Sequence, residues 1–283
     1  MGKFDGVLLF SDFDDTLFRS NITEAGVSEK DKREEPVVFG RNRAALDYYL
    51  SEGGLFSVAT GRAHQTFSPY LGRVPMNAPA ILSNGAVIYD FSTQKELCHA
   101  YLPRDTGADA QLLSDAMPWL GFETHLGGLV YTYRPNEITR RHIHKIGFPW
   151  VETTFDEMPG PWTKLLLQHE EHEALEEAAR WMRERFPGKY EVIFSNHRLL
   201  EITAPGATKG QAALRVAELL HIRREDLYCI GDNQNDIPML AVSAIPFAPA
   251  NCAKEVRDFG ARLVCSCDEG AIADVVDVLD TRY

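Results

Sequence analysis

The chain has 283 residues, 45% of them hydrophobic, so it is long enough to bury one large core or two ordinary ones. Its 41 acidic side chains against 29 Lys and Arg give a formal net charge of −12, and no basic run is long enough to follow a nucleic-acid backbone. We therefore expect no nucleic-acid partner. Only a short apolar run precedes the first acidic loop, so we also expect no signal peptide, no membrane span and a cytoplasmic location.

The first apolar segment, residues 7–10, ends directly in a group of acids. A continuously apolar run of this kind is typical of a central parallel strand that is covered on both faces. In an open α/β sheet, ligands bind at the carboxyl ends of the strands, so Asp12 and Asp14 are expected where a substrate arrives. Taken alone, the motif is equally compatible with a solvated turn.

Two carboxylates two residues apart suit phosphoryl transfer through an aspartyl-phosphate. Asp12 would attack phosphorus, and Asp14 would handle the proton of the leaving oxygen. Because a carboxylate is repelled by a phosphate dianion, a divalent cation is needed between them. Mg²⁺ fits best, since it is a hard cation that prefers oxygen ligands.

The next segments complete a first βαβ unit. Residues 18–40 are polar and are expected to form a solvated connection near the site entrance. A helix over 41–52 then leads to a second strand that begins at Leu55. This strand ends at Thr60 and Gly61, where a hydroxyl and backbone N–H groups suit the oxygens of a phosphate.

The sequence pattern changes in the middle of the chain. From about residue 86 to residue 202 the segments are shorter and alternating, and amphipathic helices lie between them, the clearest over 170–186. This pattern is typical of helices over a mostly antiparallel sheet. We therefore expect an inserted α+β cap domain that determines substrate specificity. The expected boundaries are 1–85 and 204–283 for the core, 86–203 for the cap, and hinges near 84–87 and 202–207.

The core resumes at Thr208, and Lys209 opens a helix that brings one ammonium group to the acids. A third strand, from Leu227, ends in a glycine turn that carries Asp232 and Asp236, a second source of metal ligands. Strands and helices then alternate to the end of the chain. The predicted fold class is α/β, a doubly wound parallel sheet with the inserted α+β cap.

Taken together, these motifs resemble the haloacid dehalogenase (HAD) superfamily, and more closely its Cof-type (subfamily IIB) phosphatases. The resemblance covers nearly the whole chain. It rests on Asp12-x-Asp14-x-Thr16, Thr60-Gly61-Arg62, Ser83-Asn84-Gly85-Ala86, Glu201-Ile202 with Lys209-Gly210, and Gly231-Asp232-x-x-Asn235-Asp236.

The resemblance implies a role for each motif residue. Asp12 is implied as nucleophile and metal ligand, and Asp14 as general acid and base with its backbone carbonyl on the metal. The other implied metal residues are Asp232, as a direct carboxylate ligand, and Asp236, acting indirectly or through water. The residues implied to bind the phosphoryl group are Thr60, Gly61, Lys209 and Asn235, of which Thr60 and Lys209 are also counted as catalytic.

One position departs from the family pattern: a residue that is often Gly is here Asp15. An extra acid adds negative charge near an anionic substrate, so it either restrains Asp12 or points to solvent without effect. We expect the harmless outcome, because the residues around it are intact.

The leading hypothesis is a Mg²⁺-dependent phosphatase of small phosphorylated metabolites, with sugar phosphates favoured because a sizeable cap covers the site. The alternatives are a sugar phosphomutase or phosphotransferase that uses the same nucleophile, and a non-catalytic protein that binds a phosphate ligand. A dehalogenase is disfavoured, because that chemistry needs neither Asp14 nor Mg²⁺ ligands. The polar cap residues considered for reading the leaving group, with no preference among them, are His125, Arg134, Lys164 and Asn196.

The remaining cysteine and histidine patterns favour no further site. The five cysteines form neither a Cys-x-x-Cys motif nor a disulfide framework, and we expect reduced thiols. His142-Ile143-His144 and His169-x-x-His172 lack the spacing of a His-Glu-x-x-His metal motif. The second pair is expected on a solvated surface at the start of a helix.

Overall fold

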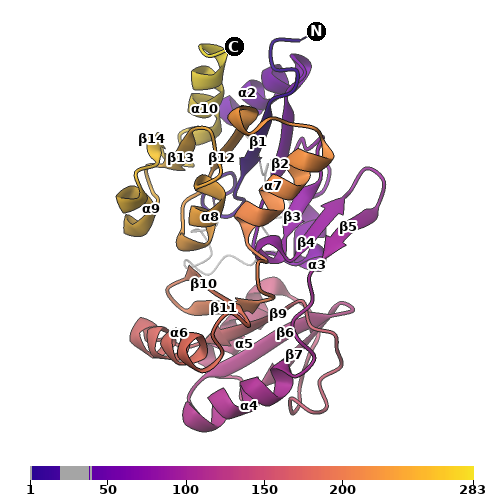
Figure 1. The fold of residues 1–283 in the computed structure, drawn as a ribbon, viewed down its shortest axis with the longest axis vertical. Coiled ribbons are helices and arrows are strands. Elements are labelled where there is room, and N and C mark those ends of the chain that lie inside the picture. The colour runs from indigo at the N-terminus through magenta and orange to yellow at the C-terminus, as the bar shows by residue number, and fades with distance from the viewer. Residues whose placement is uncertain (1, 20–37, 39) are drawn as a thin grey trace. The chain divides into compact units, whose positions relative to one another are not determined.

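The computed structural model describes residues 2–19, 38 and 40–283, so most of the connection expected over 18–40 lies outside the described residues. The chain divides into two compact units (Figure 1). We call Met1–Cys98 with Thr208–Tyr283 the core unit, and His99–Ala207 the inserted unit.

The core unit is built on a parallel sheet of five strands in the order β14-β13-β12-β1-β2. The strands are β1 (Leu8–Ser11), β2 (Leu55–Val58), β12 (Leu227–Ile230), β13 (Pro246–Pro249) and β14 (Arg262–Val264). Ser11 at the end of β1 is level with Ile230 on one side and Val58 on the other. The chain segments that follow these three strands therefore leave the sheet at the same edge.

Helices cover both faces of this sheet. The side chains of Leu9 and Tyr228 pack with α2 (Gly40–Ser51) and α10 (Ala271–Asp280) on one face. Leu8 and Cys229 pack on the other face with α7 (Lys209–Leu219), α8 (Ile237–Leu240) and α9 (Lys254–Phe259). Because both faces are covered, β1 is apolar over residues 8–10, as the sequence indicated.

The boundaries between the units differ from the expected ones. β3 (Ala80–Leu82) pairs antiparallel with β4 (Val87–Asp90), which neighbours β5 (Lys95–His99). This pairing keeps residues 86–98 in the core unit, so the first boundary falls after Cys98. At the second crossing, the Thr203 hydroxyl donates to the carbonyl of Ala207, and 204–207 stay with the inserted unit.

The inserted unit contains a six-stranded sheet in the order β10-β11-β9-β6-β7-β8, antiparallel except where β7 meets β8. Its strands are β6 (Gly121–Leu126), β7 (Leu129–Tyr133), β8 (Trp150–Glu152), β9 (Lys164–Gln168), β10 (Glu191–Asn196) and β11 (Leu199–Thr203). Phe122 and Leu167 face a core that includes residues of α4 (Thr106–Ala116) and α6 (His172–Arg185). Val130, on the opposite face, packs with α5 (Glu137–Ile146).

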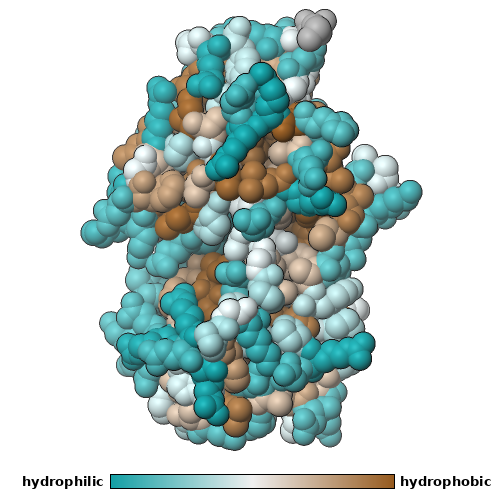
Figure 2. Space-filling view, in the orientation of Figure 1, coloured by the Kyte–Doolittle hydropathy of each residue, from teal (hydrophilic) through white to brown (hydrophobic). Residues whose placement is uncertain are grey.

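The predicted fold class is therefore confirmed: a doubly wound parallel core carries an inserted α+β unit. Hydrophilic side chains cover most of the visible surface in Figure 2, in keeping with the high net charge. In the described parts of the chain, no helix combines the length and the apolar character needed to cross a membrane.

Candidate active site

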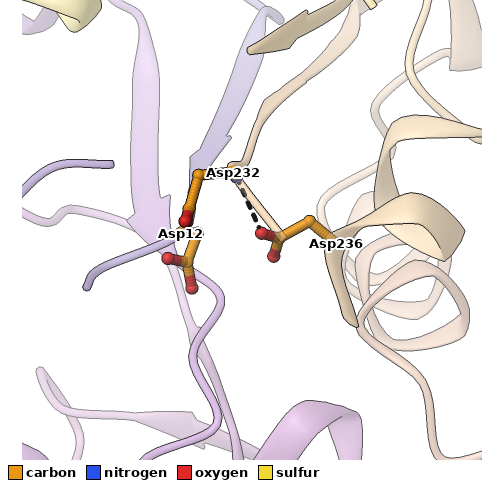
Figure 3. Close-up of side chains that lie close together, drawn as sticks. All are labelled: Asp12, Asp232 and Asp236. Atoms are coloured by element: carbon orange, nitrogen blue, oxygen red, sulfur yellow. Dashed lines mark hydrogen bonds between the residues drawn. The ribbon is translucent and has the colours of Figure 1, made fainter. Parts of the chain in front are cut away.

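Three carboxylates meet at the carboxyl edge of the core sheet (Figure 3). Asp12 follows β1, Asp232 follows β12 after one glycine, and Asp236 ends the short helical turn η5 (Gln234–Asp236). One oxygen of each carboxylate lies within 4.8 Å of the others. The parallel register of β1 and β12 explains why two segments more than 200 residues apart in sequence place acids side by side.

Lys209 is the cation at this group of acids. Its Nζ lies 2.6 Å from Oδ1 of Asp12 and 2.6 Å from Oδ1 of Asp236, and its side chain is fully buried. Thr208, the N-cap residue of α7, accepts a hydrogen bond from the backbone N–H of Gln211, which fixes the start of the helix that carries Lys209. Burial alone would lower the pKa of Lys209, but the two carboxylates outweigh it and raise the pKa, so the ammonium group stays charged.

Burial and mutual repulsion make the ionised form of these acids unfavourable. Burial raises the pKa of Asp12 to about 7, with Lys209 opposing the shift and Asp236 adding to it. Burial, together with Asp12 and Asp236, also raises the pKa of Asp232 well above its usual range. Among the described residues, Lys209 is the one cationic side chain that forms an ion pair with this group. Three clustered carboxylates beside a single ammonium favour a further cation.

The donor atoms of this group fit Mg²⁺, because hard carboxylate oxygens are the ligands that it prefers. Asp236 is already engaged: its Oδ1 accepts from Lys209, and its Oδ2 accepts from the backbone N–H groups of Asp232 at 2.9 Å and Asn233 at 3.0 Å. Asp236 therefore fixes the loop that presents Asp232. Gly231 permits this approach, since a Cβ there would lie 2.4 Å from Cβ of Asp236.

Asp14 is not one of the three clustered acids; its carboxylate pairs with Arg62. The Nε and Nη2 atoms of Arg62 each lie 2.7 Å from an oxygen of Asp14. The guanidinium also lies over the rings of Phe13 and Tyr70, at 5.3 Å and 5.0 Å from their centroids. Sequence reasoning gave Arg62 no role, although it stands in the Thr-Gly-Arg motif and the motif was the signal that could have identified it.

The residues predicted to bind a phosphoryl group are connected through a short turn. Thr60 is buried, its Oγ1 accepts from the N–H of Arg62 at 3.1 Å, and its carbonyl accepts from the N–H of Asn84 at 3.0 Å. Asn235 is also buried, and its Nδ2 donates to Oδ1 of Asn84 at 3.0 Å. Gly61 lies between Thr60 and Arg62. The structure thus links Thr60 and Asn235 through Asn84, a motif residue to which the sequence assigned no role.

Asp15 adopts the left-handed backbone conformation, with φ of 60°. Asn, Asp and Gly tolerate this conformation best, which explains how an aspartate fits where the family pattern often has glycine. The Asp15 N–H donates to the carbonyl of Phe18, and its own carbonyl accepts from Nδ2 of Asn251 at 2.8 Å. Its negative charge is one of the influences that raise the pKa of Asp232, so it acts on the site electrostatically.

Each polar residue considered for the leaving group has a partner inside the inserted unit. His125 Nε2 lies 2.5 Å from Oε1 of Glu123, and Lys164 Nζ donates to Glu201 at 2.9 Å. Arg134 donates to the carbonyl of Ser114 at 2.9 Å, and Asn196 Oδ1 accepts from the N–H of Arg198 at 2.8 Å. Sequence reasoning also missed that His142 lies against buried Glu123, at 2.9 Å.

Comparison with known proteins shows which family the chain is similar to. The family model for haloacid dehalogenase-like hydrolases matches residues 9–276. The chain is 24% identical over 271 residues to the 5-amino-6-(5-phospho-D-ribitylamino)uracil phosphatase YwtE of Bacillus subtilis, covering 87% of this chain and 93% of the relative. It is 23% identical to the HMP-PP phosphatase of Serratia proteamaculans, covering 81% and 84%. The solved structure of the HAD subclass IIB sugar phosphatase BT4131 is similar in fold, with a TM-score of 0.79, 19% identity, and coverage of 97% and 99%.

Proposed function

The chain belongs to the haloacid dehalogenase-like hydrolase family, as a phosphatase of its Cof type, and on that premise we propose that it hydrolyses phosphate monoesters of small metabolites with Mg²⁺. One observation carries the proposal. Buried Asp12 stands at the carboxyl end of β1, an inner strand of the core sheet, within one cluster with Asp232 and Asp236, and is paired with Lys209. A carboxylate in this setting has the partners that an attacking group needs beside a phosphate.

The carboxylates of Asp12 and Asp232 would hold the Mg²⁺ ion together with the backbone carbonyl of Asp14, while Asp236 orients the loop. When bound, the ion supplies positive charge that offsets the repulsion between a carboxylate and a phosphate dianion. Support for this assignment comes from the raised pKa values of Asp12 and Asp232, because a cation would relieve the cost of keeping both ionised.

The reaction proposed for the residues of this chain has two stages. A carboxylate oxygen of Asp12 attacks phosphorus, and the bond to the ester oxygen breaks as Asp14 gives that oxygen a proton. Asp14 then takes a proton from a water molecule that attacks the aspartyl-phosphate, which restores Asp12 and releases inorganic phosphate. Lys209 holds Asp12 in place and offers positive charge to the phosphoryl oxygens, which develop charge in the transition state.

Arg62 would position Asp14 for the second proton transfer, because N–H donors on both oxygens favour the ionised carboxylate that takes a proton from water. Asp14 protonated for the first transfer would keep one of these bonds. The two hydrogen bonds of Arg62 hold the Asp14 carboxylate in a fixed plane, and the rings of Phe13 and Tyr70 hold the guanidinium. Taking a proton from water requires a geometry that is correct to within a hydrogen-bond length. Two parallel bonds from a planar guanidinium provide that precision better than a single lysine contact would.

The substrate class proposed here is the phosphate monoesters of small metabolites, sugar phosphates first. Two observations support it: the inserted unit is of the α+β type expected of a cap, and similar proteins are named as a ribitylaminouracil phosphatase, an HMP-PP phosphatase and a sugar phosphatase. We propose that the inserted unit selects the leaving group.

The experiment that tests the function is release of inorganic phosphate from a panel of sugar, nucleotide and cofactor phosphates, with and without Mg²⁺. Wild type and Asp12→Asn are assayed side by side. We expect Mg²⁺-dependent release by the wild type, and a loss of at least about a thousandfold in the variant, because the attacking group is gone. Equal turnover by the variant would refute the nucleophile. If the wild type releases no phosphate but moves a phosphoryl group between sugars when given a bisphosphate activator, the chain is a mutase.

A further inference from the structure

The turn of Ser83, Asn84 and Gly85 follows β3 and has an unusual backbone. All three residues are left-handed, with φ of 49°, 56° and 102°. Serine tolerates this conformation poorly, because its Cβ comes too close to the following carbonyl oxygen. Strain of this kind persists only where surrounding contacts determine it, and it is concentrated at functional sites.

The contacts that determine this turn come from two of the site motifs. The N–H of Ser83 donates to the carbonyl of Arg62 at 2.9 Å, and the N–H of Asn84 donates to that of Thr60 at 3.0 Å. On the other side, a Cβ added to Gly85 would lie 2.2 Å from the carbonyl oxygen of Thr208. The turn therefore packs between the end of β2 and the start of the helix that carries Lys209.

The Asn84 side chain extends these contacts to a third motif. It is fully buried, and its Oδ1 accepts from Nδ2 of Asn235, 151 residues further along the chain. Within the described residues, Nδ2 of Asn84 and Oδ1 of Asn235 are buried and have no hydrogen-bond partner. A second bond between the same two amides would satisfy both atoms, yet the structure has only one. Buried polar atoms without a partner are rare in native proteins, so this open donor calls for an explanation.

We propose that Asn84 is a phosphate-binding residue of this site, which orients the amide of Asn235 and donates through its own Nδ2 to a phosphoryl oxygen; this rests on the proposed function. A phosphate ester dianion offers only acceptors, and the atom that Asn84 leaves open is a donor. Asn84 is joined to Thr60 by a backbone bond and to Asn235 by a side-chain bond, and Gly85 packs on Thr208. It therefore stands at the point where the predicted phosphate-binding residues meet.

The test is the isosteric change Asn84→Asp. Aspartate keeps an acceptor for Asn235 and tolerates the left-handed backbone, so the turn is preserved, but an anion replaces the open donor. Asn42→Asp is the matched control, because Asn42 is another buried asparagine of the core unit, and its Oδ1 accepts from the N–H of Ala273 in α10. The readouts are KM for the best phosphate ester, kcat, the inhibition constant of inorganic phosphate, and thermal stability.

We expect Asn84→Asp to raise both KM and the inhibition constant of inorganic phosphate by about tenfold or more, since a lost hydrogen bond to a charged group is joined by repulsion. Asn42→Asp should leave both constants unchanged. The double variant Asn84→Ala with Asn235→Ala should lose less binding than the sum of its single changes, because the two amides act as a unit.

Wild-type constants in a folded Asn84→Asp variant would overturn the inference and leave the phosphatase intact. If the wild type shows no phosphatase activity, binding of inorganic phosphate is measured directly by calorimetry. Weaker binding in Asn84→Asp than in wild type would then still support the site, whereas equal or absent binding would remove it. These measurements therefore distinguish an error in the proposed phosphatase function from an error in the role assigned to Asn84.

Discussion

Both units of the molecule bury charged side chains, but they neutralise them differently. In the inserted unit, the fully buried Glu123 is matched by His125, His142 and Gln168. In the core unit, three carboxylates lie together, and the ammonium of Lys209 pairs with two of them, Asp12 and Asp236. The charge of Glu123 is thus matched by neighbours within its own unit, whereas the core cluster keeps an excess of negative charge, as expected of a site that binds a cation.

The pKa shifts of the two clusters have opposite directions. Burial raises the pKa of both Asp12 and Glu123. For Asp12 the neighbouring acids add to that effect, and the pKa rises to about 7 despite Lys209. For Glu123 the two histidines outweigh burial, and the pKa falls well below its usual value. Removing a charged residue should therefore have different consequences in the two units.

Two sets of residues allow each unit to be followed on its own. All four tryptophans, at positions 119, 150, 162 and 181, belong to the inserted unit, so intrinsic fluorescence reports its unfolding. All five cysteines belong to the core unit and are free, and three of them, Cys229, Cys252 and Cys267, are buried, so the reaction of these three with a thiol reagent under denaturant reports the core. A change confined to one unit should therefore move one signal and leave the other in place.

The largest effect is expected for Lys209→Met. The variant leaves Asp12 and Asp236 buried without their cation, which should destabilise the core unit by about 3 to 5 kcal/mol and shift thiol exposure to lower denaturant. Turnover should fall at least about a hundred- to a thousandfold, because a donor to the phosphoryl group is lost. Lys254→Met, which breaks an exposed pair with Asp258, is the control and should change neither quantity measurably. Wild-type turnover by Lys209→Met would show that the site does not need the ammonium group of Lys209.

The next effect is expected for Glu123→Gln. The variant removes the anion between His125 and His142, and should destabilise the inserted unit by about 2 kcal/mol at pH 7, as measured by tryptophan fluorescence in a denaturant series. Thiol exposure of the core unit should be unaffected. Glu152→Gln on the exposed strand β8 is the control. An equal shift in both signals would show that this cluster is not confined to its own unit.

The same variant predicts a pH dependence. Because the pKa of folded Glu123 is below the unfolded value of 4.5, its contribution is fully present above pH 4.5 and is lost as the pH falls further towards the folded pKa. The difference in unfolding free energy between wild type and Glu123→Gln should therefore shrink as the pH falls below 4.5. A difference that grows below pH 4.5 would reverse the assigned direction of the shift.

An effect of similar size, but confined to the core unit, is expected when Mg²⁺ is added to the wild type. A cation that binds the folded core should delay thiol exposure, by about 2.7 kcal/mol at a hundred times its dissociation constant, and leave the fluorescence signal of the inserted unit unchanged. Asp232→Ala should abolish the shift, because it removes a carboxylate of the cluster. In the absence of metal, Asp12→Asn should be at least as stable as wild type, since it relieves repulsion among the acids. Stabilisation that persists in Asp232→Ala would move the ion elsewhere.

The elements around the site were predictable because local signals determine them. The apolar run of residues 7–10 became β1, the helix expected over 41–52 is Gly40–Ser51, and Lys209 opens its helix as expected. Each of these follows from periodicity, a glycine stop or an N-cap residue within a few positions. The parallel order of strands then brings their ends to one edge, so the sequence was sufficient to place the acids together.

The remaining features depend on partners far apart in sequence. Arg62 bonds to Asp14 across 48 residues, Asn235 to Asn84 across 151, and Gln168 to Glu123 across 45. No local pattern indicates which of many polar residues will meet. The first boundary of the inserted unit lies further along the chain than expected for the same reason, because the pairing of β3 with β4 carries the core unit beyond the glycine that marked the expected hinge.

The smallest effect is expected for Asp15→Asn, which tests whether the charge of Asp15 contributes to Mg²⁺ binding at the core cluster. Asn tolerates the left-handed backbone as Asp does, so the change removes a charge that raises the pKa of Asp232 while the turn is kept. Mg²⁺ should bind about two- to threefold more weakly, since one nearby carboxylate is lost at an effective dielectric typical of a protein surface. Asp15→Gly is the matched variant: it removes the same charge and tolerates the same φ, so the two should agree if charge is the cause. Equal Mg²⁺ affinity in wild type, Asp15→Asn and Asp15→Gly would instead mean that the charge of Asp15 does not affect the site. The excess negative charge that attracts the cation would then come from Asp12, Asp232 and Asp236 alone.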